Sequence, residues 1–383
     1  MNLIEFGSIA HIQKGKKPLR QIDHPQVGYM PYVDIEAFEK GNIKTYTDGE
    51  KCLPCKAGEI LIVCDGSRSG FVGRAIDGYV GSTLAVISAD GMSTDYLYYF
   101  LQGKYALLNT KKKGTGTPHL DQQILFQQKL IVPSLEEQER IVARIEELFS
   151  ELDNGVETLQ KTKQQLMVYR QAVLKDAFSG NWQCHKAEGL CDFITKGTTP
   201  QKNDQLKEGK IPFIKVYNLT FDTSLDFNID PTYVSEEIHK GFLARSIVYP
   251  GDVLLNIVGP PMGKVSIVPN TYKEWNINQA IARFRCKDGL YNKFLAYFLG
   301  FAPTVEKMKS QSKATAGQFN LTLEICRNIE IPLPAIEKQK EIVASIESRL
   351  SVCDNIEKTV DTALQQAEAM RQSILKQAFE GRL

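Results

Sequence analysis

The sequence lacks several features that define whole classes of protein. It contains no run of about 18 apolar residues, so no membrane-spanning helix and no membrane partner are expected. The N-terminus, MNLIEFGSIA, has no basic stretch followed by an apolar core and does not resemble a signal peptide. Eight cysteines scattered over 383 residues do not form a disulfide framework, so we expect a cytoplasmic protein.

The signatures of common catalytic sites are also missing. The segment GPPMGKV (259–265) has neither the spacing nor the hydroxyl of a nucleotide-binding loop. Its first four residues lack the polar acceptor and the aromatic ring of an amino-methyltransferase tetrad. No Gly-x-Ser-x-Gly elbow occurs. We therefore predict no catalytic residue, although a hydrolase or transferase with an unrecognised site remains an alternative.

The cysteine spacing gives little support for a metal site. Cys52-Leu-Pro-Cys55 has the spacing of a ligand pair, and Cys64 is near in sequence. A structural zinc site needs four ligands, usually from two such pairs. The other candidate ligands are distant: Cys184, His185 and Cys191. We expect no metal, and interpret the pair as a turn with two half-buried thiols.

A 50-residue segment occurs twice in the chain. Residues 133–182, beginning PSLEEQERIVARIEELFS, align without gaps to residues 334–383, beginning PAIEKQKEIVASIESRLS, with 21 identities. Each copy starts at a proline and ends near a glycine, which is typical of a helix. The first copy adds a capping-box pattern, Ser134 with Glu137, whereas the second has Ala335 in place of the serine.

Both copies carry an apolar stripe. Alternating steps of four and three residues from Ile141 and from Ile342 meet mostly apolar residues, a spacing that indicates a coiled-coil seam. About 45 helical residues at 1.5 Å each span roughly 68 Å. That length favours two helices packed on each other over the alternative, an amphipathic helix lying on a globular core.

The segments before the helices also repeat, more faintly. Short motifs recur in the same order in residues 1–132 and 183–333, and both segments have β-branched and aromatic runs broken by Gly, Pro, Asn and Asp. The motif pairs are FGSIAHIQKGKKP with CDFITKGTTP, KAGEILIV with YPGDVLLNI, SGFVGRA with PPMGKVS, YLYYFLQ with FLAYFLG, and GTGTPHL with KATAGQFNL.

We therefore predict a mixed α/β fold with a pseudo-two-fold internal repeat. Residues 1–132 and 183–333 form two sheet-rich globules, and residues 133–182 and 334–383 form two long helices. If the repeats are related by a two-fold axis, the helices form an antiparallel coiled coil.

The whole chain resembles the specificity subunits of type I restriction-modification systems. The resemblance is carried by the two helix-start segments, by GDVLL followed by GPPMGKV, and by RQAVLKDAFSG with RQSILKQAFEG. It implies two target-recognition domains, each followed by a helical region, in a non-catalytic subunit that reads a bipartite site in double-stranded DNA. It also implies docking of two adenine-methyltransferase (modification) subunits and, through them, a restriction/translocase subunit. S-adenosylmethionine, ATP and Mg would belong to those partners, and this chain would hold no cofactor.

Charge agrees with DNA contact through the globules. The net charge is +2 for residues 1–132 and +3 for residues 183–333, but −3 and −1 for the two helices. Lys and Arg dominate affinity for phosphates, and polar side chains read base edges. In Gly- and Thr-rich loops we therefore predict DNA contacts at Lys14, Lys16, Lys17, Arg20, Arg68, Lys111, Lys112, Lys113, Thr115, Lys196, Thr198, Lys202, Lys309, Gln311 and Lys313. Among these, Arg68 lies between small residues and is expected to be mobile. The alternative is that each is a solvated surface residue.

The repeat also predicts two equivalent surfaces for one partner. We expect these to be exposed positions shared by both copies: Glu136 and Glu337, Gln138 and Gln339, Arg170 and Arg371, and Lys175 and Lys376. The alternative is that these residues were retained for packing or capping at the helix ends. A different function for the whole chain, a coiled-coil scaffold with two protein-binding domains and no nucleic acid, also remains open.

Overall fold

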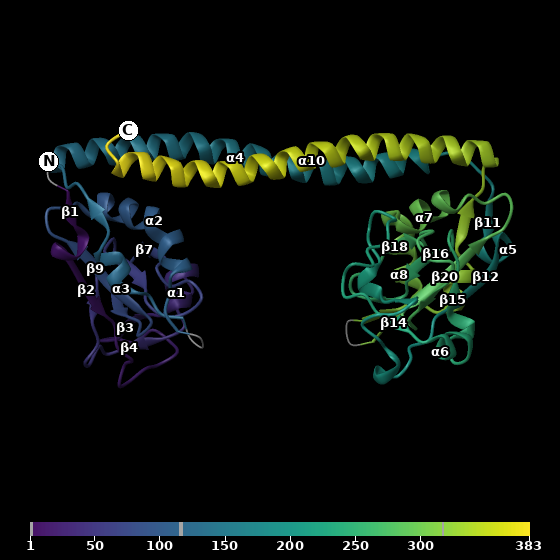
Figure 1. The fold of residues 1–383 in the computed structure, drawn as a ribbon, viewed down its shortest axis with the longest axis horizontal. Helices are drawn as coiled ribbons and strands as arrows, with labels where there is room; N and C mark the ends of the chain where they lie inside the picture. The colour runs from purple at the N-terminus through teal and green to yellow at the C-terminus, as the bar shows by residue number, and fades with distance from the viewer. Residues whose placement is uncertain (1–2, 115–117, 316–317) are drawn as a thin grey trace. The chain divides into compact units, whose positions relative to one another are not determined.

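A computed structural model describes residues 3–114, 118–315 and 318–383. The chain divides into two units (Figure 1). Unit 1 comprises Met1–Gln160 and Asp361–Leu383, and unit 2 comprises Lys161–Val360. The predicted site residue Thr115 lies outside the described residues. No helix in the described part of the chain is long and apolar enough to cross a membrane.

Unit 1 contains two four-stranded sheets. The first has the order β2-β9-β6-β7 and is antiparallel, and the second has the order β4-β3-β8-β5 with one parallel pair, β3 with β8. A two-stranded sheet joins β1 to β10. The strands are β1 Ile4–Glu5, β2 Ala10–Lys14, β3 Met30–Val33, β4 Tyr46–Thr47, β5 Pro54–Cys55, β6 Ile60–Val63, β7 Val72–Arg74, β8 Gly78–Val80, β9 Leu84–Ala89 and β10 Lys129–Leu130.

Unit 2 repeats this arrangement. Its sheets have the orders β12-β20-β16-β18 and β14-β13-β19-β15, again with one parallel pair, β13 with β19, and β11 pairs with β23. The strands are β11 Cys184–Lys186, β12 Cys191–Lys196, β13 Ile211–Ile214, β14 Tyr233–Val234, β15 Ile247–Val248, β16 Val253–Asn256, β17 Val258–Gly259, β18 Val265–Ile267, β19 Trp275–Ile277, β20 Ile281–Cys286, β21 Lys313–Thr315, β22 Gln318–Asn320 and β23 Glu330–Pro332. The faint sequence repeat therefore reflects one fold present twice.

Helices cover the first sheet of each unit. In unit 1, Leu97, Phe100 and Leu101 of α2 are buried in the core cluster that includes β6 and β9. In unit 2, the corresponding core cluster buries Phe294, Leu295 and Leu299 of α7. The short helices are α1 Ile35–Lys40, α2 Thr94–Thr110, α3 Gln122–Phe126, α5 Ala187–Leu190, α6 Glu236–Lys240, α7 Asn292–Gly300, α8 Ala302–Gln311 and α9 Leu323–Arg327.

The two long helices are α4, Leu135–Ala177, and α10, Ile336–Phe379. Ser134 caps the first of them by accepting a hydrogen bond from the Glu137 amide at 3.3 Å, as the capping box predicts. The predicted seam is buried or half-buried at most positions, and Ile145 and Ile346 are buried. Tyr169, Ile356 and Met370 are seam positions that stay exposed, because a straight helix drifts by about 20° per heptad from a 3.5-residue repeat.

Within each unit the long helices run antiparallel. In unit 1, Ile145 of α4 packs with Ala378 of α10, whereas Asp153, further along α4, pairs with the earlier Arg371. In unit 2, Arg170 pairs with Asp354, and the later Asp176 pairs with the earlier Arg349. Residue numbers rise along one helix as they fall along the other, which confirms the predicted antiparallel coiled coil.

Candidate nucleic-acid interface

In each unit the first sheet has an edge strand that ends at a lysine, and a glycine follows that lysine in the chain. In unit 1, β2 ends at Lys14 and the Gly15 amide donates to the carbonyl of Leu84 at 2.9 Å. In unit 2, β12 ends at Lys196 and the amide of Gly197 donates to Ile281 at 3.1 Å. The two lysines therefore hold equivalent places, at the point where the chain leaves the sheet.

In each unit a second lysine pairs through its backbone with a polar residue a few positions later in the chain. In unit 1, Lys113 and His119 exchange both backbone hydrogen bonds, at 2.9 and 2.7 Å. In unit 2, Lys313 of β21 pairs with Asn320 of β22. The lysine of each unit is thereby held by antiparallel backbone pairing.

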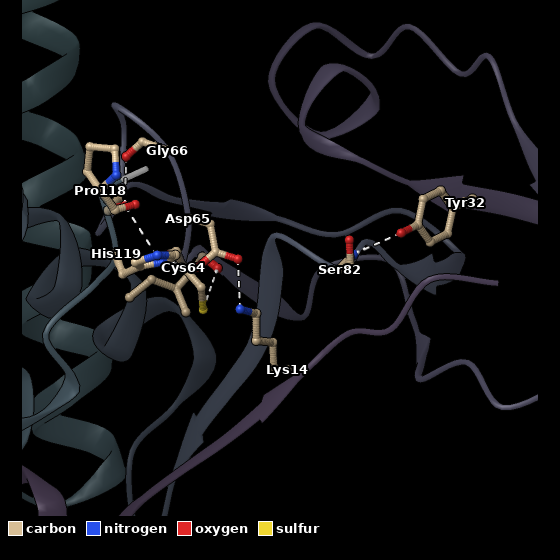
Figure 2. Close-up of polar contacts among 10 residues, drawn as sticks. Lys14, Tyr32, Cys64, Asp65, Gly66, Ser82, Pro118 and His119 are labelled. Atoms are coloured by element: carbon tan, nitrogen blue, oxygen red, sulfur yellow. Dashed lines mark hydrogen bonds and ion pairs between the residues drawn. The ribbon is translucent and has the colours of Figure 1, made fainter. Parts of the chain in front are cut away.

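Asp65 joins these two segments in unit 1. Its carboxylate accepts a hydrogen bond from Lys14 Nζ at 2.7 Å and lies 2.7 Å from Nδ1 of His119 (Figure 2). Burial raises the pKa of Asp65, but the bonds to Lys14 and His119 outweigh it, and the net pKa lies below its ordinary value. We call Lys14, Asp65 and His119 the Asp65 cluster.

The predicted lysine triplet lies beside this cluster. Lys112 Nζ donates to the carbonyl of Ser67 at 3.0 Å, and Lys113 forms an ion pair with Asp121 at 3.0 Å. The hydrogen bond from Lys113 lowers the pKa of Asp121 despite an opposing effect of burial. Lys111 is exposed, and its ammonium group has no polar partner among the described residues. Of the three ammonium groups, that of Lys111 is therefore the most available to a phosphate.

The other predicted DNA contacts of unit 1 differ in exposure and in whether they already pair with protein groups. Lys16 and Lys17 are exposed and make no ion pair within the described part of the chain. Arg20 lies 3.5 Å from Asp48 and is mostly exposed. The expectation that Arg68 is mobile is wrong, because its guanidinium pairs with Glu39 at 2.9 Å and covers the Phe71 ring at 4.0 Å.

In unit 2, Lys196 and Lys202 are exposed, with no ion pair to any described residue. Thr198 accepts a hydrogen bond from Arg245 Nε at 2.9 Å. Lys309 pairs with its helix neighbour Glu306 at 2.7 Å, and Gln311 is exposed at the end of α8. Only the backbone of Lys313 is described.

Sequence reasoning missed the polar side chains that lie among these basic residues. The predicted set consisted mostly of lysines and omitted Asp65, His119, Arg245 and Asn320. One signal was present, because the alignment of GTGTPHL with KATAGQFNL places His119 opposite Asn320. Nothing in the sequence indicates that Asp65 lies close to Lys14 and His119, because it is 51 positions from the first and 54 from the second.

Two of the predicted partner contacts are buried instead of exposed. Gln138 is fully buried; its Oε1 accepts from the Ser93 amide at 2.7 Å and its Nε2 donates to Gly91 O and Pro133 O. Gln339 in unit 2 is also fully buried. Its amide bonds to Tyr291 N, Gly289 O and Pro334 O in the same pattern. The expectation of exposure was wrong because each glutamine ties a helix start to the loop before α2 or α7.

Two further predicted partner contacts, Arg170 and Arg371, form ion pairs within the coiled coil. Arg170 pairs with Asp354 at 2.6 Å and Glu357 at 2.9 Å, and its side chain is 26% exposed. Arg371 pairs with Asp153 and lies over the Phe149 ring at 4.8 Å. Both guanidiniums therefore bind the opposite long helix within their own unit.

The remaining predicted partner contacts are accessible. Glu136 and Glu337 are exposed in the first turns of α4 and α10. Lys175 and Lys376 are exposed in the last turns, where Lys376 lies 4.0 Å from Glu380.

The cysteine pair expected in a turn with two half-buried thiols differs in burial. Cys52 is half-buried and Cys55 is buried, and burial raises the pKa of the Cys55 thiol to about 11. In the described ranges, no group of three or more His, Cys, Asp or Glu side chains is arranged to hold a metal ion.

Replacing Asp65 by asparagine should destabilise the protein in a pH-dependent way. Because folding lowers the pKa of Asp65, its contribution is complete above the unfolded value of about 3.9 and is lost as the pH falls through the folded value. We therefore expect Asp65→Asn to lower the thermal midpoint at pH 7, and the difference from wild type to shrink below about pH 4. A difference that is independent of pH would contradict the ionic role of this carboxylate.

Comparison with known proteins identifies the family. The family model described as "Type I restriction modification DNA specificity domain" matches residues 1–166 and 179–366. The type I restriction enzyme MjaVIII specificity subunit of Methanocaldococcus jannaschii is 24% identical, over 100% of this chain and 92% of its own length. The EcoBI specificity subunit of Escherichia coli is 26% identical, over 99% and 85%.

A solved structure has the same fold. It comes from work on complex assembly and conformational transition of the type I restriction-modification system, is 21% identical, and covers 100% of this chain and 98% of its own at a TM-score of 0.78. Because the family model accounts for most of both units, the chain belongs to the family of type I restriction-modification DNA specificity domains.

Proposed function

We propose that this specificity subunit reads a bipartite DNA target, with one half-site bound by each unit. The observation that carries the proposal is that one backbone framework occurs twice with different side chains at equivalent places. Unit 1 has Asp65 and His119 where unit 2 has Val258 and Asn320. Equivalent lysines, Lys14 and Lys196, would bind phosphates in both units, and the differing side chains would give each unit its own base preference.

The family is that of non-catalytic DNA-recognition subunits, so the test measures binding. The full chain, with its modification subunit, would be used to select bound sequences from a pool of random duplexes. We expect an enriched sequence with two defined segments separated by an unread gap. Selection of a single continuous segment would contradict the bipartite proposal.

Removing the lysine triplet should weaken this binding without changing its preference. In the variant Lys111→Ala/Lys112→Ala/Lys113→Ala, each lost phosphate contact lowers the slope of log K against log salt concentration by about 0.9. The largest part of the effect should come from Lys111, because the other two ammonium groups already bind protein oxygens. Titrations at several salt concentrations measure the slope, and an unchanged slope would place this loop away from DNA.

We further propose that two methyltransferase subunits dock on the repeated helix ends and recruit the restriction/translocase subunit. Equivalent hollows support two equivalent sites. One of about 220 Å³ in unit 2 is lined by Phe178 and Phe298, and one of about 420 Å³ in unit 1 is lined by their counterparts Phe379 and Phe100. S-adenosylmethionine, ATP and Mg would be bound by those partners.

Charge reversal at the exposed lysines tests this docking. Lys175→Glu with Lys376→Glu should lower the stoichiometry from two modification subunits per chain, as measured by native mass spectrometry. These lysines are better probes than Arg170 and Arg371, whose reversal would disrupt the coiled coil itself. Unchanged two-to-one assembly would contradict docking at this surface.

A further inference from the structure

We infer that His119 in unit 1 and Asn320 in unit 2 are equivalent specificity-determining residues, each contacting a base edge in the half-site of its own unit. The inference rests on the proposed function. It goes further by assigning the difference between the two half-sites to one pair of positions.

The two residues occupy the same place in the fold. His119 bridges to Lys113 on one side and to Asp65 on the other, and Asn320 pairs in the same way with Lys313 and Val258. The following residue repeats the match. The Leu120 amide donates to Cys64 O at 2.7 Å, and the amide of Leu321 donates to Ile257 O at 2.8 Å. Backbone geometry is therefore shared, and only the side chains differ.

These side chains are available to a ligand, whereas their neighbours are not. Leu120 and Leu321 are buried and identical, as packing requires. The side chain of His119 is 55% exposed, and Asn320 is exposed. The amide of Asn320 has no hydrogen-bond partner among the described residues. A change of residue type at an exposed position leaves the core intact, so packing does not account for the difference between the units.

The chemistry of both groups suits base recognition. An asparagine amide offers a donor and an acceptor together, which matches the N6 and N7 atoms of adenine in the major groove. Asp65 binds Nδ1 of His119 and leaves Nε2 without a protein partner among the described residues (Figure 2). That nitrogen accepts a hydrogen bond from a base amino group when neutral, or donates to a guanine edge when protonated.

Neighbouring lysines would place these groups against the bases. Lys14 binds the same carboxylate as His119 and keeps two further N–H donors, so a phosphate that takes one of them would lie beside the imidazole. Lys196 has the equivalent place in unit 2. Phosphate contacts fix the register of a protein on DNA, and adjacent polar groups then read sequence. In this arrangement Asp65 is a positioning residue that orients both His119 and Lys14.

Exchanging the two side chains tests the inference. The full-length variants His119→Asn and Asn320→His would be carried through the duplex selection together with wild type. We expect His119→Asn to change the preferred base at one position in one half-site, and Asn320→His to change one position in the other. Asn320→His should lower affinity for the wild-type target by about 5- to 150-fold, since a bidentate base contact discriminates by roughly 1–3 kcal/mol. The single contact of His119 predicts a smaller loss for His119→Asn. Binding to unrelated DNA should be unchanged.

Matched variants separate base reading from a structural effect. His24→Asn is the control for unit 1, because His24 is also exposed and also pairs with an aspartate, Asp23 at 2.9 Å, and has no contact with the described residues of the Asp65 cluster. It should leave both half-sites unchanged. Asp65→Asn should relax the preference in the unit 1 half-site alone, and Asp65→Glu should restore part of it.

The outcomes are distinct. If wild type selects a bipartite target and both exchange variants select the same one with unaltered affinity, these residues do not read bases and the inference is overturned. If each variant changes both half-sites, the effect is a general structural one, which also overturns it. If wild type itself selects no bipartite target, the proposed function fails, and this inference fails with it.

Discussion

Replacing Gly15 or Gly197 by alanine is expected to destabilise strongly the domain that contains it. A Cβ atom at Gly15 would overlap the carbonyl oxygens of Val80 and Gly81, and one at Gly197 would overlap those of Ile277 and Asn278. Backbone atoms of a buried sheet cannot rotate away as a side chain can. We expect a loss of about 3 kcal/mol or more in the free energy of unfolding, above the usual range for overpacking.

Gly155 is the control, because alanine at this position is expected to raise the stability instead of lowering it. It lies inside α4, and a Cβ atom there would meet no atom within 4 Å. Alanine is favoured over glycine in a helix by about 0.8–1.0 kcal/mol, so Gly155→Ala should stabilise the protein. Urea unfolding followed by circular dichroism measures all three variants. Equal stability of Gly15→Ala and wild type would show that the close crossing of the chain over the second sheet is not rigid.

Replacing Gln138 or Gln339 by leucine should detach the start of a long helix from its domain. The leucine has a similar size but leaves one amide and two carbonyl groups without partners in each unit. An unsatisfied buried polar group costs roughly 1–3 kcal/mol. Because Gly91 and Gly289 are exposed to water, each variant should lose about 1–3 kcal/mol in total. Hydrogen exchange at the Ser93 and Tyr291 amides should become faster in the corresponding variant only.

The exposed neighbour Glu139 is the control for this experiment. Glu139→Gln changes a side chain on the same helical turn that faces solvent, and should leave both stability and amide exchange unchanged. Slow exchange at Ser93 in Gln138→Leu would contradict the role assigned to the glutamine. The expected result explains the repetition of this residue by helix docking, the alternative to partner contact raised by the sequence.

The helix seam and the repeat were predictable because they depend on local and periodic information. Spacing along a helix places side chains on one face, so Ile145, Val173 and Ile346 could be assigned to buried positions from their order in the chain. The capping role of Ser134 was predictable for the same reason, since its partner lies three residues away. The equivalence of Lys14 and Lys196 followed from aligning the two globules.

The accessibility of polar residues was not predictable, because it depends on partners distant in sequence. Gln138 was assigned to the surface, but the loop that buries it is 45 residues earlier. Arg68 was expected to be mobile, but Glu39 and Phe71 hold it from two sides. A polar side chain carries no signal of whether its hydrogen bonds go to water or to protein.

The sequence alone therefore determined that this chain contains two sheet-rich domains, two long antiparallel helices and an internal repeat that identifies its family. Only the tertiary structure decided which polar groups of the proposed DNA-recognition surface are free and which are bound. It placed His119 beside Lys14 through Asp65 and put Asn320 at the matching point of unit 2. The physical reason is that periodicity fixes which face of an element is apolar, whereas the pairing of individual polar atoms is settled only when distant segments pack together.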